Sequence, residues 1–287
     1  MTSDPSIKAI ASGHSAVITG GAGGIGFAAA QEFVSRGMNV LIADIDEQLS
    51  AEAKDSLMGQ AVNDAKVLSF ACDVSNLDSL KEMASFAAAE MGNVSVLMNN
   101  AGMGMDTGKP WETPEKWHQL LNVNLWGVIN STHAFVPAML EAGKPGLVIN
   151  TGSKQGITRP PGGSAYNLSK AGVIAFTESM AHEFRQIESC SLSAHLLVPG
   201  FTYTGMISKW LPEKPEGAWT SEQVVAFMLE RLQAGDFYIL CPDNDVTREM
   251  DEKRIQWYAD DLIKNRPALS RWHPDFAEAF AKFMDEG

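Results

Sequence analysis

The chain has 287 residues, of which 45% are hydrophobic and 20% charged, and its formal net charge is −13 at pH 7. This length suits one large domain or two small ones, and the composition is that of an ordinary globular protein. Because a negative field repels phosphate backbones, we expect no nucleic-acid partner. No charged start precedes an apolar run and no long apolar stretch occurs, so we expect neither a secretion signal nor a membrane partner.

The cysteines and histidines predict a reduced protein without a metal site. Cys72, Cys190 and Cys241 lie far apart and form no Cys-x-x-Cys pair. Cysteines of this kind are typical of intracellular proteins, so we expect a cytoplasmic location. The six histidines and three cysteines form no cluster with the spacing of metal ligands.

Short apolar runs alternate with longer segments of helical spacing. Near-continuous apolar strands separated by helices predict an α/β fold, with a parallel sheet covered by helices on both faces. Such a sheet binds ligands outside the carboxyl ends of its strands. The predicted strands span residues 15–19, 39–43, 67–71, 94–98, 147–150, 192–198 and 237–240, and the predicted helices residues 25–36, 46–62, 77–91, 114–142 and 163–187.

A glycine-rich segment, residues 19–26, follows the first strand and opens the next helix. Gly20, Gly24 and Gly26 allow a tight turn and a close approach to a pyrophosphate, while the helix N-terminus offers N–H groups and a positive dipole end. The same pattern also occurs as a turn without a ligand. Its place between a strand and a helix favours a dinucleotide site, to which we assign Ile25 as well.

Asp44 follows the second strand and indicates which dinucleotide would bind. A carboxylate there can accept hydrogen bonds from both hydroxyls of the adenosine ribose and would repel a 2′-phosphate. No arginine or lysine follows at once, since the next residues are Ile45 and Asp46. Asp44 therefore predicts NAD rather than NADP as the cofactor. The alternative is that it caps the helix that begins near Asp46.

Polar and small residues also follow the third and fourth strands. Asp73 can accept a hydrogen bond from an adenine amino group while Val74 packs on the ring, although Asp73 can equally be a turn or capping residue. After the fourth strand, the small residues of the stretch 99–102 let the chain pass close to a ribose, and an asparagine there can tie neighbouring strands together.

Tyr166 and Lys170 stand four residues apart, on one face of a predicted helix, and Ser153 follows the fifth strand. A nearby ammonium favours the phenolate, so we expect the pKa of Tyr166 to fall from about 10 toward neutrality. Such a tyrosine can serve as an acid or base, and the Ser153 hydroxyl can hold the oxygen that exchanges the proton. Alone, the pair is also compatible with a core tyrosine and a surface lysine.

These segments, together with Asn124 and Pro199-Gly200, resemble the motifs of the short-chain dehydrogenase/reductases, in their compact one-domain branch. The resemblance runs from about residue 12 to 242 and implies a doubly wound, seven-stranded parallel sheet, the Rossmann fold. It implies that Tyr166 is the acid/base and that Ser153 holds the substrate oxygen. Lys170 would lower the pKa of Tyr166 and bind the nicotinamide ribose, and Asn124 would interrupt its helix and hold a water that links Lys170 to solvent.

The same resemblance implies further contacts with the cofactor. Thr202 stands where the family often has an aliphatic residue, whereas Thr204 matches the usual threonine. These threonines and Pro199-Gly200 would abut the nicotinamide carboxamide. The expected cofactor-binding residues are Gly20, Gly24, Ile25, Gly26, Asp44, Asp73, Val74, Asn100, Ala101, Gly102, Tyr166, Lys170, Pro199, Gly200, Thr202 and Thr204.

Two regions bear on the substrate and on assembly. Residues 201–220 are expected to form a lid over an apolar or aromatic substrate, with Met206, Trp210 and Gln155 as candidate contacts; alternatively its aromatic residues only pack the lid onto the body. Arg159 either meets a substrate carboxylate or faces solvent. We divide the chain into a catalytic domain, 1–242, and a helical extension, 243–287, with helices over 243–264 and 274–284. The extension can cover the substrate site, block a subunit interface or form a new one.

The resulting prediction is an NAD-dependent enzyme that transfers a hydride between a secondary alcohol or ketone and nicotinamide. By resemblance, the helices over 114–142 and 163–187 would pair between subunits, so we expect a homodimer or homotetramer. One alternative is a catalytically idle, NAD-sensing or scaffold protein on the same fold. Another is a sugar-nucleotide epimerase or dehydratase, for which 47 residues after Leu240 look too few.

Overall fold

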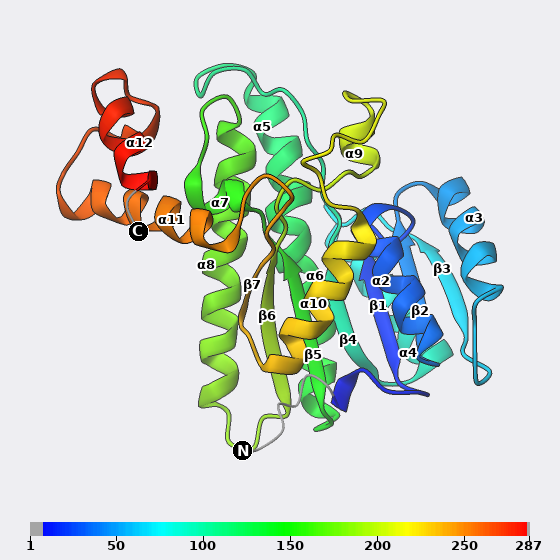
Figure 1. Cartoon of the computed structure of the whole chain (residues 1–287). Helices are drawn as coiled ribbons and strands as arrows, with labels where there is room; N and C mark the ends of the chain where they lie inside the picture. The colour runs from blue at the N-terminus through cyan, green and yellow to red at the C-terminus, as the bar shows by residue number, and fades with distance from the viewer. Residues whose placement is uncertain (1–7, 286–287) are drawn as a thin grey trace.

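The computed structural model describes residues 8–285. Their centre is a sheet of seven parallel strands in the order β3-β2-β1-β4-β5-β6-β7 (Figure 1). The strands are β1 (Ser15–Thr19), β2 (Asn39–Asp44), β3 (Val67–Ala71), β4 (Val94–Asn99), β5 (Gly146–Thr151), β6 (Leu192–Val198) and β7 (Tyr238–Leu240). The predicted α/β fold and all seven predicted strands are therefore confirmed.

Helices cover both faces of the sheet because alternate residues of each strand are buried on opposite sides. In β1, Ile18 packs with α2, α3 and α10, and Val17 packs with α4, α6 and α8. The helices of the first face are α2 (Gly24–Ser35), α3 (Glu47–Met58) and α10 (Ser221–Ala234), and those of the second are α4 (Leu77–Met91), α6 (Gly127–Glu141) and α8 (Ser164–Gln186).

The strand order of the sheet changes direction between β1 and β4. From β1 the chain moves outward to β2 and β3, and it then returns to pair β4 with the free side of β1. The carboxyl ends of β1 and β4 thereby leave a crevice, where ligands of open α/β sheets bind. The glycine-rich segment after β1 and the stretch 99–102 after β4 meet at this point.

The predicted long helix over 114–142 is three consecutive segments. α5 (Pro114–Leu121) leads into one π-helical turn, η1 (Asn122–Trp126), and α6 follows directly. The resemblance implied an interruption at Asn124, and the π-helical turn is that interruption. π-Helical turns occur frequently at functional sites, because they change the direction in which a helix presents its groups.

Three helical segments differ from the sequence predictions. α10 was not predicted, although Thr220 and Gln223 form a capping box at its start and Gly235 ends it. α7 (Lys154–Thr158) was also not among the predicted helices, and Ser153 is its N-cap residue. The lid contains only one short helix, α9 (Gly205–Ser208), and Trp219 packs edge-on against Phe227 of α10.

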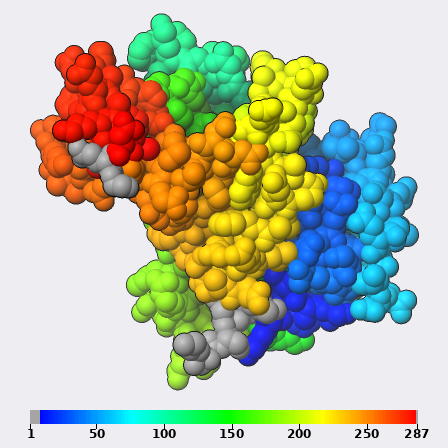
Figure 2. Space-filling view, viewed as in Figure 1, coloured from blue at the N-terminus to red at the C-terminus, as the bar shows by residue number. Residues whose placement is uncertain are grey.

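The C-terminal extension consists of α11 (Arg248–Ile263), the short 3-10 turns η2 (Ser270–Trp272) and η3 (Pro274–Phe276), and α12 (Ala277–Asp285). α11 starts five residues later than predicted, because Asp243 forms a turn by accepting hydrogen bonds from the main-chain N–H groups of Asp245 and Val246. Figures 1 and 2 show the extension at the end of the molecule opposite β3, with α11 beside α7. In the described part of the chain, no helix is long and apolar enough to span a membrane.

Candidate active site

A cavity of about 480 Å³ opens at the carboxyl ends of β1, β4, β5 and β6. Its volume falls in the range of sites for cofactors and drug-sized ligands. It brings together most of the predicted site residues from segments far apart in the sequence. Its lining includes Gly20, Gly24, Ile25, Asp44, Asn100, Ala101, Gly102, Ser153, Gln155, Tyr166, Lys170, Pro199, Gly200, Thr202, Thr204 and Met206.

The glycine-rich segment suits a pyrophosphate by its backbone and by its lack of side chains. The N-cap residue of α2, Gly23, has an open space where a Cβ would stand, and no side chain caps the helix. The N–H groups of the first turn are therefore available to an anion. Gly26 does not line the cavity; a Cβ there would lie 2.2 Å from Gly20 O, so its role is to let the turn close. These observations fit a bound dinucleotide.

Asp44 lies at the end of β2 with its carboxylate toward the glycine-rich segment. One carboxylate oxygen accepts a 3.4 Å hydrogen bond from Ala22 N, and the residue lines the cavity. The capping role that was the alternative for Asp44 belongs to Asp46, which accepts a hydrogen bond from Leu49 N at 2.9 Å. This leaves Asp44 placed to meet a ligand.

The structure does not bring Asp73 and Val74 to the cavity. Asp73 is exposed, and its carboxylate accepts hydrogen bonds from the N–H and the hydroxyl of Ser75. The Val74 side chain is buried in the core, where it packs against Gly127. The expectation that Val74 covers an adenine ring with its side chain is therefore wrong, because hydrophobic packing with α6 directs that side chain inward.

Two asparagines at the end of β4, Asn99 and Asn100, hold the strand ends together. Asn99 donates to Asn150 Oδ1 at 2.8 Å, and Asn150 in turn donates to the hydroxyl of Thr177 at 3.0 Å. Asn100 donates to Gly20 O at 3.2 Å and thereby joins the glycine-rich segment to β4. All these groups are buried or part-buried, so each would be costly to leave without a partner.

The hydroxyls of Ser153 and Tyr166 are neighbours in the lining of the cavity. Ser153 is held in place as the N-cap of α7, where its Oγ accepts a hydrogen bond from Gln155 N at 3.2 Å. Tyr166 lies in the first turn of α8. The two side chains thus present a pair of hydroxyls to the cavity, from two helices that pack on each other.

Lys170 lies one turn along α8, with its ammonium group buried behind the tyrosine. Its Nζ donates to Thr151 O at 2.8 Å and lies 5.8 Å from the centroid of the Tyr166 ring. Burial lowers the pKa of Lys170 from 10.5 to about 8. Asn124 is fully buried and bonds on both sides to Met103, through Met103 N at 2.8 Å and Met103 O at 2.9 Å.

The pKa of Tyr166 was expected to fall, but in the protein by itself it is raised. Burial raises the pKa of Tyr166, and the hydrogen bond with Ser153 opposes this only in part. The reason is that removing the phenolate from water disfavours it more than the neighbouring groups stabilise it. The protonated phenol is thus the form at neutral pH.

Next to the lid, Trp210 and Lys154 differ from the prediction. Met206 lines the cavity as expected, but Trp210 does not and is 73% exposed. Trp210 comes after α9, in a turn closed by hydrogen bonds to Ile207 O, which leaves its side chain in solvent. Lys154 also lines the cavity and was missed, although its position directly after Ser153 was a signal.

Arg159 contacts the extension, which neither alternative for this residue included. Its guanidinium lies 4.6 Å from the centroid of the Tyr258 ring and donates to the Tyr258 hydroxyl. This contact joins the end of α7 to α11. Among the described residues, no side chain of α11 or α12 lines the cavity, so the extension touches the site through α7 and through Phe201, whose N–H donates to Asp243.

Characterised relatives are oxidoreductases. The chain is 36% identical over 203 residues to the 3-oxoacyl-acyl-carrier-protein reductase of Thermotoga maritima, covering 70% of this chain and 79% of the relative. It is 34% identical over 201 residues to 3beta-hydroxysteroid dehydrogenase 2 of Eggerthella lenta (69% and 74%). It is 29% identical over 264 residues to the 1-deoxy-11-beta-hydroxypentalenate dehydrogenase of Streptomyces exfoliatus (90% and 94%).

Solved structures with the same fold include complexes with either nicotinamide dinucleotide. A short-chain dehydrogenase/reductase from Burkholderia phymatum, in complex with NAD, aligns with a TM-score of 0.79 and 28% identity over 89% of this chain and 96% of its own. A metagenomic short-chain oxidoreductase in complex with NADP aligns with a TM-score of 0.67 and 27% identity (81% and 98%). The family model for short chain dehydrogenases matches residues 14–215. The chain belongs to the short-chain dehydrogenase family and is an oxidoreductase of that family.

Proposed function

We propose that the chain transfers a hydride between a secondary alcohol or ketone and NAD. The observation that carries the proposal is the pair of hydroxyls, from Ser153 and Tyr166, in the cavity that the glycine-rich segment also lines. A hydroxyl pair beside a site suited to a dinucleotide is what proton exchange with an alcohol oxygen requires.

The side chains divide the work in this proposal. Ser153 holds the substrate oxygen by a hydrogen bond, and Tyr166 gives its proton to that oxygen in reduction or takes it in oxidation. A bound oxidised nicotinamide would supply the hydride acceptor and a further positive charge. Because burial raises the pKa of Tyr166, we expect oxidation to become faster as the pH rises toward that pKa, measured as kcat against pH.

Lys170 and Asn124 support this pair from behind. Lys170 Nζ, held by Thr151 O, would bind the nicotinamide ribose and keep a positive charge near Tyr166. The side chain of Asn124 is occupied by both main-chain groups of Met103, so a water relay from Lys170 would use the Asn124 main chain.

Solved relatives bind either dinucleotide, so the preference must come from this chain's own residues. Asp44, which lines the cavity, supports NAD. A carboxylate at this place accepts from the ribose hydroxyls and repels a 2′-phosphate. We expect the chain to bind NADH more tightly than NADPH, and Asp44→Ala to narrow the difference by about tenfold or more. Fluorescence titration of both variants with both nucleotides measures this, and tighter binding of NADPH by the unchanged chain would refute it.

We propose that exposed Asp73 meets the adenine amino group, with Val74 contributing only its main chain.

An apolar alcohol or ketone is supported by the residues between the hydroxyl pair and the lid. Phe201, Met206 and Ile207 line that side, and Gln155 adds one polar group. Two of the relatives are named for a hydroxysteroid and a hydroxypentalenate as substrates. We therefore expect KM to fall as the apolar surface of the alcohol grows, until the part of the cavity that the cofactor leaves free is filled.

A turnover assay with NAD and a panel of secondary alcohols, from small aliphatic to polycyclic, tests the proposal against a catalytically idle protein. Reduction of NAD that requires both the enzyme and the alcohol supports an enzyme. Tight NAD binding with no turnover across the whole panel, in both directions and from pH 6 to 10, would support the idle alternative.

We further propose that the chain forms a homodimer or homotetramer through α5, η1, α6 and α8. Trp126 of η1 and Leu168 of α8 are each 51% exposed, which suits an apolar contact between copies. Light scattering coupled to size exclusion measures the mass, and Trp126→Glu should shift it toward the monomer.

A further inference from the structure

Lys154 is a lysine of intermediate burial directly beside the hydroxyl pair. It follows Ser153 and is the first residue of α7, and its main-chain N–H donates to Pro199 O. Its side chain is only 15% exposed and lines the cavity. An ammonium that is largely removed from water needs a compensating charge, because its desolvation is unfavourable.

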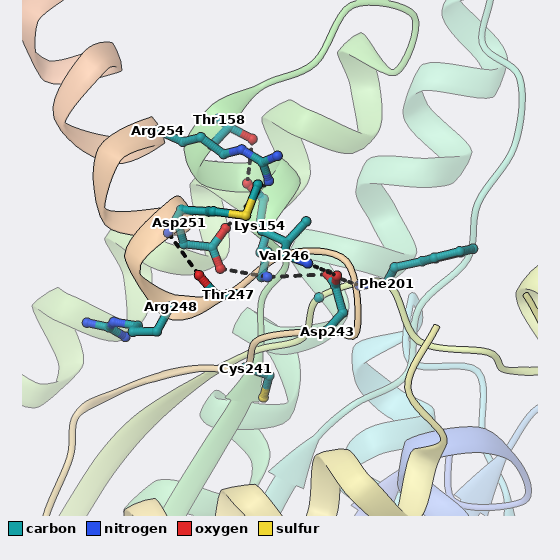
Figure 3. Close-up of polar contacts among 12 residues, drawn as sticks. Lys154, Thr158, Phe201, Cys241, Asp243, Val246, Thr247, Arg248, Asp251 and Arg254 are labelled. Carbon is teal, nitrogen blue, oxygen red and sulfur yellow. Dashed lines mark hydrogen bonds and ion pairs between the residues drawn. The ribbon is translucent and has the colours of Figure 1, made fainter. Parts of the chain in front are cut away.

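Two buried carboxylates of the C-terminal region supply that charge. Lys154 Nζ lies 2.6 Å from Asp251 Oδ2 in the first turn of α11 and 3.4 Å from Asp243 Oδ2, and these side chains are 5% and 4% exposed. Figure 3 shows the lysine between the two carboxylates, reaching from α7 toward α11. Arg254 lies 3.9 Å from the other oxygen of Asp251, so the cluster of Lys154, Asp243, Asp251 and Arg254 has balanced charges.

The same cluster also holds the start of the lid. Asp243 Oδ2, which contacts Lys154, accepts a 3.1 Å hydrogen bond from Phe201 N. A Cβ on Gly200 would lie 2.6 Å from Asp243 Oδ2 and 3.0 Å from Lys154 Nζ, so the ion pair packs directly on the main chain there. Three segments thus meet in one ion-pair cluster: Ser153 with α7, the stretch Pro199–Phe201, and the extension.

We propose that Lys154, Asp243 and Asp251 are positioning residues, through which the C-terminal extension sets the position of Ser153 and of the first residues of the lid. This proposal rests on the proposed function for its kinetic consequence but not for its structural one. In this role, the extension acts on catalysis without lining the cavity. A misplacement of about 1 Å in a catalytic group can cost up to about a hundredfold in rate.

The alternative is that the cluster only stabilises the fold, and Asp261 provides a matched control. Asp261 lies on the same helix, is 8% exposed, and pairs with Arg266 at 2.8 Å. It also accepts hydrogen bonds from the N–H and the hydroxyl of Ser270, so its polar partners lie in the extension itself. Asp251→Asn and Asp261→Asn therefore both remove one buried charge from α11, but only the first removes a charged partner of Lys154.

Hydrogen exchange tests the structural consequence without any substrate. In Asp251→Asn we expect faster exchange, by about threefold or more, for the amides of residues 154–158 and of Phe201, with α2 unchanged. In Asp261→Asn we expect faster exchange near Ser270 and none at residues 154–158. Unchanged exchange at residues 154–158 in Asp251→Asn, or equal acceleration there in both variants, overturns the proposal.

Kinetics test the catalytic consequence on the full chain with NAD and a substrate found in the panel. We expect Asp251→Asn to lower kcat by about tenfold or more with the Kd for NAD changed less than about twofold. Asp251→Glu, which keeps the charge, should recover most of that loss, and Asp261→Asn should stay within about twofold of the unchanged chain. Equal loss of kcat in Asp251→Asn and Asp261→Asn overturns the proposal. If the unchanged chain turns over nothing, the proposed function fails, and the exchange experiment alone decides on the positioning role.

Discussion

The nucleotide side and the substrate side of the cavity are built in different ways. On the nucleotide side, groups pack closely on the main chain: the Asn100 side chain donates to Gly20 O, and Gly26 leaves no room for a Cβ beside the same carbonyl. On the substrate side, buried charges join distant segments, as between Lys154 and Asp251. Substitutions that add volume should therefore impair the nucleotide side, and substitutions that remove a charge should alter the substrate side.

The largest expected effect concerns the point where the two sides meet. Tyr166→Phe removes only the hydroxyl that exchanges the proton, so we expect turnover to fall by about a thousandfold or more while NAD binding stays within about twofold. Steady-state kinetics and a binding titration measure the two quantities. Tyr238→Phe is the control, because Tyr238 bonds to Glu178 on the surface, away from the cavity. Near-normal turnover in Tyr166→Phe would falsify the assignment.

On the nucleotide side, two neighbouring glycines should respond differently to one methyl group. A Cβ at Gly26 would stand 2.2 Å from Gly20 O, so we expect Gly26→Ala to lower the free energy of unfolding by about 3 kcal/mol. At Gly23 a Cβ meets nothing within 4 Å, so Gly23→Ala should change stability by less than about 1 kcal/mol but weaken NAD binding. Denaturant unfolding and titration distinguish them, and equal stability in both variants would contradict the packing argument.

On the substrate side, the charge of Lys170 should cost stability. Its pKa is lowered from 10.5 to about 8, so the unfolded chain binds more protons between these pH values, and the cost is fully present below pH 8. After allowance for the lost hydrogen bond to Thr151 O, we expect Lys170→Met to raise the free energy of unfolding at pH 7 by about 2 kcal/mol while abolishing turnover. The gain should shrink as the pH rises from 8 to 10.5, and a gain independent of pH would contradict this cause.

The smallest effects separate two residues of the lid. Trp210 is 73% exposed, so Trp210→Ala should leave KM and stability nearly unchanged, within about twofold and 0.5 kcal/mol. Met206 lines the cavity, and Met206→Ala should raise KM for an apolar alcohol several-fold, about 1 kcal/mol of binding. A larger effect on KM at Trp210 than at Met206 would mean that the lid closes differently from the arrangement described.

Predictions from sequence succeeded where the cause is local. The strands follow from short apolar runs, and the glycine-rich segment follows from glycines between a strand and a helix. α10 was missed although its capping box, Thr220 and Gln223, was readable. α11 was predicted to start too early, because the turn formed by Asp243 competes with helix formation.

Predictions about environment were less successful. Val74 was assigned to a ligand but packs in the core, and Trp210 was assigned to the cavity but lies in solvent. The pKa of Tyr166 was expected to fall and instead rises, since sequence spacing shows a neighbouring charge but not the extent of burial. In each case the side chain's surroundings come from segments that are distant in sequence.

By itself, the sequence determined the α/β fold, the family, and the placing of Gly20, Asp44, Ser153, Tyr166 and Lys170 at strand ends or on one helix face. Periodicity, glycine spacing and helix geometry suffice for this, because each acts within a few residues. Only the tertiary structure decided which groups are desolvated and which charges meet. The contact of Lys154 with Asp243 spans 89 residues, and no local pattern encodes it. Such contacts form when folding buries charged groups and each must find a partner.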